Sequence, residues 1–281
     1  MAVAPDMRAT FWYGCNMARH GEIIRLSTRI LEAVGVDAAP AGGPGYCCGS
    51  PQEKSARIAA GMAERTVQKF NEKGRDQLIT WCPSCHMNMD DFMAPVTEAA
   101  FETQHITQLL QVRRDRLRPF LTHEVKARVL IHAHHGFNGR VPVNVDVPDL
   151  LRMIPGVEIV ESDLRVPGHM CSALASVPNG LANAHRATLA AMADSGADTL
   201  VTIFHSCHRE AVTLERGRAI QVMNWIHLLA AGMGLDHSDE YKDWRNAEDP
   251  RAALGKGRVS ALGDVAFERL VEPELTKKPV V

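Results

Sequence analysis

Short apolar runs and longer amphipathic segments alternate along the chain. Gln77 to Trp81 and Thr199 to Phe204 are apolar runs of the length expected for buried strands. Glu53 to Lys73 and Leu181 to Asp194 have the spacing of apolar residues that is typical of amphipathic helices. Strands that alternate with helices in this way predict an α/β fold with short parallel sheets.

The pattern occurs twice. Three segments have counterparts further along the chain, in the same order and at offsets of 119, 123 and 122 residues: Ala9–Asn16 with Arg128–His135, Pro44–Gly49 with Pro167–Ser172, and Thr80–His86 with Thr202–His208. An internal duplication with a unit of about 120 residues explains these matches. We therefore expect two similar halves, residues 1–120 and 121–235, followed by a polar extension, residues 236–281, which we expect to be only partly ordered.

The bulk composition is that of an ordinary globular protein. Of the 281 residues 46% are hydrophobic, which is enough to bury a substantial core. The formal net charge of -2 gives no overall attraction to nucleic acid or to an anionic membrane, so neither is expected as a partner. No apolar run has the length of a membrane span or the form of an export signal, so we expect a cytoplasmic protein without direct membrane insertion.

The seven cysteines, in a chain without an export signal, predict metal-binding or catalytic thiols rather than disulfides. Five lie in the first half and are separated by 31 and 33 residues: Cys15, the vicinal pair Cys47 and Cys48, and the pair Cys82 and Cys85. Vicinal cysteines fit two corners of one zinc tetrahedron poorly, and a fifth thiol would be left over. A cluster with several metal atoms can accept all five. An iron–sulfur cluster is the leading prediction, and the alternatives are a zinc site, a redox disulfide between Cys82 and Cys85, and unrelated buried thiols.

The order Cys, Cys-Cys-Gly and Cys-x-x-Cys resembles the CCG cysteine-rich domain of the catalytic B subunit of heterodisulfide reductase, a family that carries the motif twice. The resemblance implies two pseudo-symmetric CCG-type halves. It also implies a non-cubane [4Fe-4S] cluster held by Cys15, Cys47, Cys48, Cys82 and Cys85. In that family, two such clusters face a shared pocket and split the disulfide of a bound substrate.

The second half keeps only two of the five cysteines, Cys171 and Cys207. In the aligned segments His134, Met170 and Phe204 replace three of the others, so a second cluster of the same kind is not expected. A second metal site for zinc or iron is one interpretation, and its candidate ligands are His134, His169, Cys171, His205 and Cys207. A structural relic is another. In a third, Cys171 or Cys207 is a catalytic thiol that is activated by neighbouring imidazoles and acts on a sulfur substrate.

One complete and one degraded motif together resemble the second B-type subunit of the heterodisulfide-reductase-like complex of sulfur-oxidising prokaryotes. That resemblance implies three partners: a flavin A-type subunit, a ferredoxin-like C-type subunit and a lipoate-binding protein. The leading hypothesis is an oxidoreductase subunit that transfers electrons between a partner and a thiol or disulfide. The alternatives are an electron-relay or scaffold subunit, a CCG subunit of another dehydrogenase complex, and a zinc-binding interaction module. A cavity that reaches the cluster would favour an enzyme over a relay.

Overall fold

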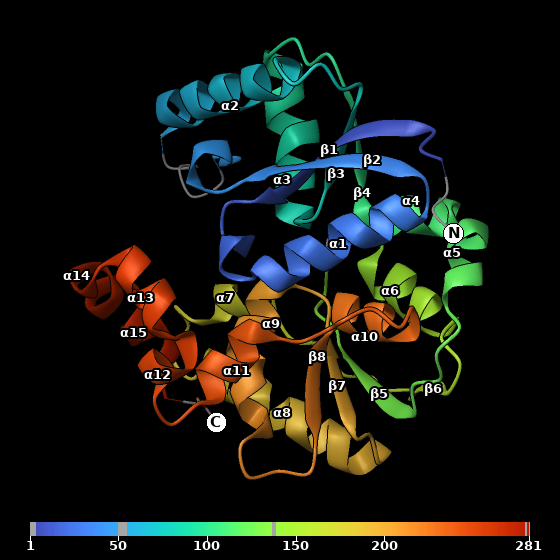
Figure 1. Cartoon of the computed structure of the whole chain (residues 1–281), viewed down its shortest axis with the longest axis vertical. Helices are drawn as coiled ribbons and strands as arrows, with labels where there is room; N and C mark the ends of the chain where they lie inside the picture. Colours follow the sequence, from blue (N-terminus) through green and yellow to red (C-terminus); the bar gives the residue numbers. More distant parts are fainter. Residues whose placement is uncertain (1–3, 50–54, 137–138, 279, 281) are drawn as a thin grey trace.

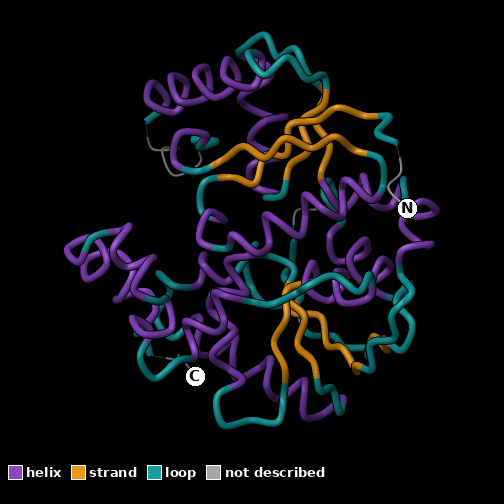
Figure 2. Tube along the Cα trace, in the orientation of Figure 1, coloured by secondary structure: helices purple, strands orange, loops and turns teal. Residues whose placement is uncertain are grey.

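The structure is a computed structural model, and it describes residues 4–49, 55–136, 139–278 and 280. Within these residues the chain forms two four-stranded sheets whose strand pairings are parallel. The two sheets and their helices lie one above the other (Figure 1, Figure 2). The predicted α/β fold with two similar halves is confirmed.

The first half has four strands with helices between them. In chain order its main elements are β1 (Met7–Gly14), α1 (Gly21–Ala33), β2 (Val36–Gly42), α2 (Ala56–Asn71), β3 (Gln77–Thr80), α3 (Pro83–Asn88), β4 (Glu102–His105), α4 (Ile106–Val112) and α5 (Arg114–Leu117). The helix predicted from Glu53 is described only from Ala56 onward, because residues 50–54 lie outside the described part of the chain.

The second half repeats this arrangement. Its main elements are β5 (Ala127–His132), α6 (Val143–Leu151), β6 (Val157–Ile159), α7 (Cys171–Leu174), α8 (Gly180–Ser195), β7 (Thr199–Thr202), α9 (His205–Ala211), β8 (Gln221–Asn224) and α10 (Trp225–Gly232). The strand orders are β2-β1-β3-β4 and β6-β5-β7-β8, which are identical when each half is numbered from its own first strand. Parallel neighbours require crossover connections, which the intervening helices and loops supply.

Helices α1, α4, α6 and α10 lie between the two sheets and join the halves (Figure 1). Helix α1 packs against α10, and α4 packs against α6. These two contacts are equivalent, because α6 is the counterpart of α1 and α10 is the counterpart of α4. One cluster of buried apolar side chains runs from Phe11 and Leu26 in the first half to Val147 and Leu229 in the second. The halves therefore share this cluster, and each half also has a separate apolar cluster of its own.

Two tryptophans stack where the halves meet. The rings of Trp81, which follows β3, and Trp225, which begins α10, are 5.7 Å apart between centroids and inclined by 9°. The indole N–H of Trp81 donates a hydrogen bond to Nδ1 of His205, at 3.2 Å. Because Trp81 precedes Cys82 and His205 lies two residues before Cys207, these contacts join the cysteine-bearing loops of the two halves.

The C-terminal extension is more ordered than the sequence suggested. It forms the short helices α11 (Glu240–Asn246), α12 (Pro250–Leu254), α13 (Lys256–Leu262), α14 (Asp264–Ala266) and α15 (Glu272–Leu275), which lie beside the second half in Figure 1. Tyr241 and Leu275 are buried in the same apolar cluster as Leu130 and Leu200 of the second sheet. A few well-placed apolar side chains thus anchor a segment whose average composition is polar. Within the described residues, no helix combines the length and hydrophobicity that a membrane span requires.

Candidate functional site

The five cysteines of the first half gather at one edge of its sheet. Cys15 follows β1, the vicinal pair follows the turn Pro44–Tyr46 after β2, and the last two lie at the start of α3 after β3: Cys15, Cys47, Cys48, Cys82 and Cys85. The carboxyl ends of parallel strands share an edge, which is why residues so far apart in the sequence meet. Cys48 and Cys85 are buried and the other three are half-buried.

Cys48 is the centre of this thiol group. It forms hydrogen bonds with Cys47 and Cys85 and interacts electrostatically with Cys15 and Cys82. A hydrogen bond with Cys85 lowers the pKa of the Cys82 thiol, whereas Cys48 and Cys82 hold the pKa of Cys85 well above its usual value. The five groups thus share protons and charge. A cation that replaced the shared protons would be bound by the thiolates.

The backbone approaches the thiols closely at Gly14. Gly14 has a φ of +79°, and a Cβ atom there would lie 3.4 Å from Sγ of Cys85. Glycine therefore suits both the conformation and the close approach of the chain. The indole N–H of Trp12 donates to the carbonyl of Tyr46 at 3.0 Å, which fixes the residue before Cys47. The donor set of five thiols fits an iron–sulfur cluster.

An apolar cavity of about 680 Å³ reaches the same thiol group. Cys48 is the one thiol among its described lining residues. The other lining residues are Gly49, which follows Cys48, and residues of α2, of α3 and of the segment that follows α3: Ala56, Ala59, Ala60, Ala63, Asn88, Phe92, Met93 and Val96. Asn88 donates from its amide to Sγ of Cys48 at 3.5 Å. The first half thus has a feature that an enzyme needs and a sealed relay does not.

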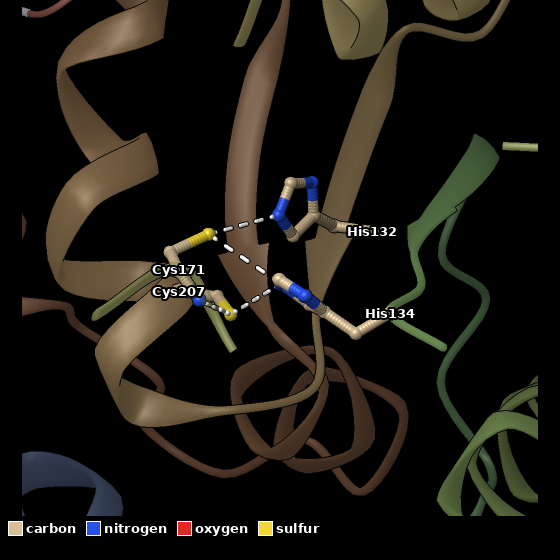
Figure 3. A group of neighbouring side chains, drawn as sticks. All are labelled: His132, His134, Cys171 and Cys207. Atoms are coloured by element: carbon tan, nitrogen blue, oxygen red, sulfur yellow. Dashed lines mark hydrogen bonds between the residues drawn. The ribbon is translucent and has the colours of Figure 1, made fainter. Parts of the chain in front are cut away.

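In the second half, two histidines and two cysteines converge (Figure 3). His132 ends β5, His134 follows two residues later, Cys171 begins α7 and Cys207 lies in α9. The side-chain atoms capable of binding a metal all lie within 4.8 Å of one another, and all four residues are completely buried. Three of the predicted ligands, His134, Cys171 and Cys207, are therefore brought together, and His132 joins them.

The other two predicted ligands face elsewhere. Nδ1 of His169 forms a hydrogen bond with the carbonyl of Gly136 at 3.0 Å, and Nδ1 of His205 accepts from Trp81. The group of four contains neither of them. The signal for His132 was present in the sequence, because residues i and i+2 of an extended strand point to the same side. His-x-His at the end of β5 could therefore have predicted the pair.

The sheet register explains why the alignment missed His132. Trp12 pairs with Thr80 in the first sheet, and His132 pairs with Thr202 in the second. By sheet register, equivalent residues of β1 and β5 are thus separated by one residue more than the 119 used in the alignment. His132 therefore takes the position of the core residue Trp12. By register the counterpart of Cys15 is the exposed His135, yet His134 is the residue that faces the thiols.

The pKa values of the two buried thiols of the second half are shifted in opposite directions. Burial raises the pKa of Cys207, but hydrogen bonds with Cys171, His132 and His134 outweigh this effect and bring that pKa well below its usual value. A hydrogen bond with Cys207 holds the pKa of Cys171 well above its usual value. Both side chains are 0% exposed, so a substrate sulfur could reach them only if the surrounding residues moved. A catalytic role for Cys171 or Cys207 stays a prediction.

A second buried polar group fixes the C-terminal extension. Nε2 of His208 and Oδ2 of Asp239 are 2.6 Å apart, and Nδ1 of His208 lies 3.2 Å from the hydroxyl of Thr202. His86 makes the equivalent contact with Thr80 in the first half, at 3.1 Å, so this histidine is a shared feature of both halves. Asp239 also caps α11 by accepting from the backbone N–H of Lys242.

Glu22 lies beside this group, and its burial predicts that the stability of the protein depends on pH. Its carboxyl is 2% exposed, and burial raises its pKa from 4.5 to about 8. Between these two pH values the native state holds a proton that the unfolded chain has released, so the free energy of unfolding falls as pH rises. Glutamine does not ionise, so Glu22→Gln removes this loss of stability at high pH. At pH 8 the variant should be more stable than the wild type by up to about 4 kcal/mol, and near pH 4.5 the two should be nearly equal.

Urea titrations of both proteins at several pH values measure this difference. The difference between the two unfolding free energies cancels the titration of all other groups. Equal free energies of unfolding at pH 8 would mean that the Glu22 carboxylate is ionised in the native state at no cost.

Comparisons with known proteins agree with this thiol site. A family model described as the CCG cysteine-rich domain matches residues 9–90. The D subunit of the dihydromethanophenazine:CoB–CoM heterodisulfide reductase of Methanosarcina acetivorans is 23% identical over 253 residues, which cover 83% of this chain and 61% of that protein. The D subunit of the same name from Methanosarcina barkeri is 24% identical over 262 residues, 84% of this chain and 63% of its own length. The chain thus spans about three fifths of these relatives.

Structural similarity adds little to this. The aspartate racemase of Picrophilus torridus is 13% identical, covers 81% of this chain and 93% of its own, and has a TM-score of 0.34, which is too low to support an argument.

The fold and the site together define a cysteine-rich α/β protein whose grouped thiols and imidazoles suit metal binding. More particularly, residues 9–90 match the CCG cysteine-rich domain, and most of the chain is similar to heterodisulfide reductase D subunits.

Proposed function

We propose that the chain is the iron–sulfur subunit of a heterodisulfide-reductase-like oxidoreductase complex, in which it transfers electrons between a partner subunit and a thiol or disulfide substrate. The observation that carries this proposal is the gathering of five thiols around Cys48 at one edge of the first sheet, inside the segment that matches the CCG domain. The names of the relatives, which are CoB–CoM heterodisulfide reductase subunits, support a sulfur substrate.

The cofactor proposed for this site is a [4Fe-4S] cluster of the non-cubane type. Five cysteines would hold it: Cys15, Cys47, Cys48, Cys82 and Cys85. When bound, such a cluster supplies single electrons at a potential that its surroundings set. The chain itself contributes the thiolates, the close backbone at Gly14 and the apolar side chains that exclude water, of which Trp12 is completely buried.

The apolar cavity next to Cys48 is the proposed binding site for the substrate. Its walls of alanine, phenylalanine and methionine would hold the apolar part of a thiol or disulfide, and Asn88 would orient a polar group. Reduction of one disulfide to two thiols consumes two electrons and two protons. Electrons would come from the partner and protons from solvent. The opposite direction, oxidation of two thiols, uses the same site.

The proposed partners are a ferredoxin-like C-type subunit and a flavin A-type subunit, with a lipoate-binding protein as the carrier of the sulfur substrate, and the proposed location is the cytoplasm. The relatives are subunits by name, which supports a multi-subunit assembly. The alternative proposal is a relay or scaffold subunit, in which the first half exchanges electrons only with other proteins.

Metal analysis tests the cofactor directly. Protein purified without oxygen should contain about four iron atoms and inorganic sulfide per chain, and the oxidised form is expected to give an electron paramagnetic resonance signal. Cys48→Ser should lose most of the iron and the signal, because it removes the thiol that interacts with each of the other four. Cys171→Ser is the matched control in the other half, and its iron content should equal that of the wild type.

Zinc in the first half, with no iron even after reconstitution, would contradict the electron-transfer proposal. It would favour a zinc-binding interaction module.

A further inference from the structure

We propose that the second half contains a closed zinc site formed by His132, His134, Cys171 and Cys207, which stabilises that half. This proposal about the second half does not depend on the proposed function of the first half. Two thiolates and two imidazoles are the most familiar ligand set of structural zinc, and four protein ligands leave no open position for substrate. The site is thus a structural element rather than a second redox centre.

The distances between the nitrogen and sulfur atoms of the four side chains already approach those between the ligands of a bound zinc ion. Nε2 of His132 lies 3.1 Å from Sγ of Cys171, and Nε2 of His134 lies 3.2 Å from Sγ of Cys207 and 3.6 Å from Sγ of Cys171. A tetrahedral zinc ion with ordinary bond lengths holds a nitrogen and a sulfur ligand roughly 3.5 Å apart. All four side chains point into the same small volume (Figure 3).

Neighbouring groups orient both imidazoles for metal binding. Nδ1 of His134 faces the carbonyl of Pro167 at 3.2 Å, and a carbonyl can only accept, so Nδ1 carries the hydrogen. Nδ1 of His132 faces the hydroxyl of Thr188 at 3.2 Å, and that hydroxyl donates to the carbonyl of Ala184 at 2.8 Å. It therefore accepts from His132. In both rings Nε2 is left with its lone pair directed at the thiols, as in zinc-bound histidines that are oriented by a second hydrogen bond.

Burial makes a bound cation favourable. All four side chains are 0% exposed, and the backbone N–H of Cys171 donates to Sγ of Cys207 at 3.3 Å. Two thiolates and one divalent cation have no net charge when the imidazoles are neutral. An uncompensated buried thiolate would be costly, whereas a neutral zinc complex avoids this cost.

Comparison of the two halves explains why one ion fits here and a larger cluster does not. Cys171 and Cys207 are the counterparts of Cys48 and Cys85, the buried pair of the first half. Met170 and Phe204 replace two other thiols, and both are apolar. His132, in place of the core residue Trp12, supplies a ligand from inside the strand. The site has thus exchanged five thiols for four mixed ligands.

Zinc content and X-ray absorption at the zinc edge test the proposal on the full-length protein. The wild type should bind about one zinc per chain, with two sulfur ligands near 2.3 Å and two nitrogen ligands near 2.0 Å. His132→Cys should keep the zinc and change the set to three sulfurs and one nitrogen. Cys171→Ala should lose it and melt at a lower temperature, with the iron content unchanged. His227→Gln, in the buried group around His208 and Asp239, is the control and should keep the zinc.

Three results would overturn the proposal. They are wild-type protein that takes up no zinc when supplied with it, iron in place of zinc at these residues, and an absorption spectrum with sulfur ligands only. The last would place zinc among the cysteines of the first half. Because iron is counted in the same samples, failure of the zinc site and failure of the iron–sulfur site are distinguished.

Discussion

Replacing Trp225 by alanine is expected to lower the free energy of unfolding by about 3–5 kcal/mol, the usual cost of removing a large buried aromatic side chain. Trp225 is 1% exposed and stacks on Trp81 in the layer between the sheets. A stacked aromatic pair contributes about 0.5–1.5 kcal/mol beyond its burial. Guanidinium titration of the anaerobic holoprotein, followed by circular dichroism, should show a lower midpoint at an unchanged slope.

Trp225→Phe is the matched control for this prediction. A phenyl ring keeps a stacking partner for Trp81 and much of the buried area, so its midpoint should lie closer to the wild type than to Trp225→Ala. If the alanine variant unfolded at the wild-type midpoint, the two halves would not depend on this contact for their stability.

Replacing Ala59 by leucine is expected to slow disulfide reduction by about fivefold to one hundredfold, which corresponds to the 1–3 kcal/mol typical of overfilling a packed space. This prediction rests on the proposed function. Ala59 lies on α2 and lines the cavity that reaches Cys48, so leucine would occupy space proposed for the substrate. The assay supplies lipoamide as the disulfide and reduced benzyl viologen as the electron donor, and two viologens are oxidised for each disulfide reduced.

The control places the same side chain elsewhere on the same helix. Arg57 is exposed and does not line the cavity, so Arg57→Leu should leave the rate unchanged. A normal rate in Ala59→Leu with full iron content would mean that the substrate binds outside this cavity. Wild-type protein that has a complete cluster but reduces no disulfide would favour the relay alternative.

The fold and the thiol group of the first half could be predicted from the sequence. The repeat predicted two similar α/β halves, and the two identical strand orders confirm them. Cys15, Cys82 and Cys85 follow apolar runs, and strand ends of a parallel sheet meet at one edge, so their approach was expected. Local pattern was sufficient here because each cysteine directly follows a strand or a turn whose position the pattern indicates.

The second half could be predicted only in part, because a one-residue difference at the end of β5 cannot be read from local similarity. The alignment placed His134 opposite Cys15, and the sheet register places His132 opposite Trp12. His205 is adjacent to the ligand group in sequence, but it turns toward Trp81 of the other half. That contact joins residues separated by 124 positions, and no periodicity encodes it.

The packing of the extension after residue 235 was harder still to predict from the sequence. Its composition is polar, and its order depends on the burial of a few residues such as Tyr241, whose ring lies 4.3 Å from that of His20. Single long-range contacts of this kind decide whether a polar segment packs, and average composition does not record them.

The equivalent contacts of α1 with α10 and of α4 with α6 have the geometry of a two-fold dimer whose subunits have been joined into one chain. In a dimer of identical subunits every substitution appears twice, so both copies of a site must change together. Here each half has its own codons, and association no longer depends on concentration. One copy can therefore keep all five thiols while the other exchanges three of them, and the common core holds both copies in place.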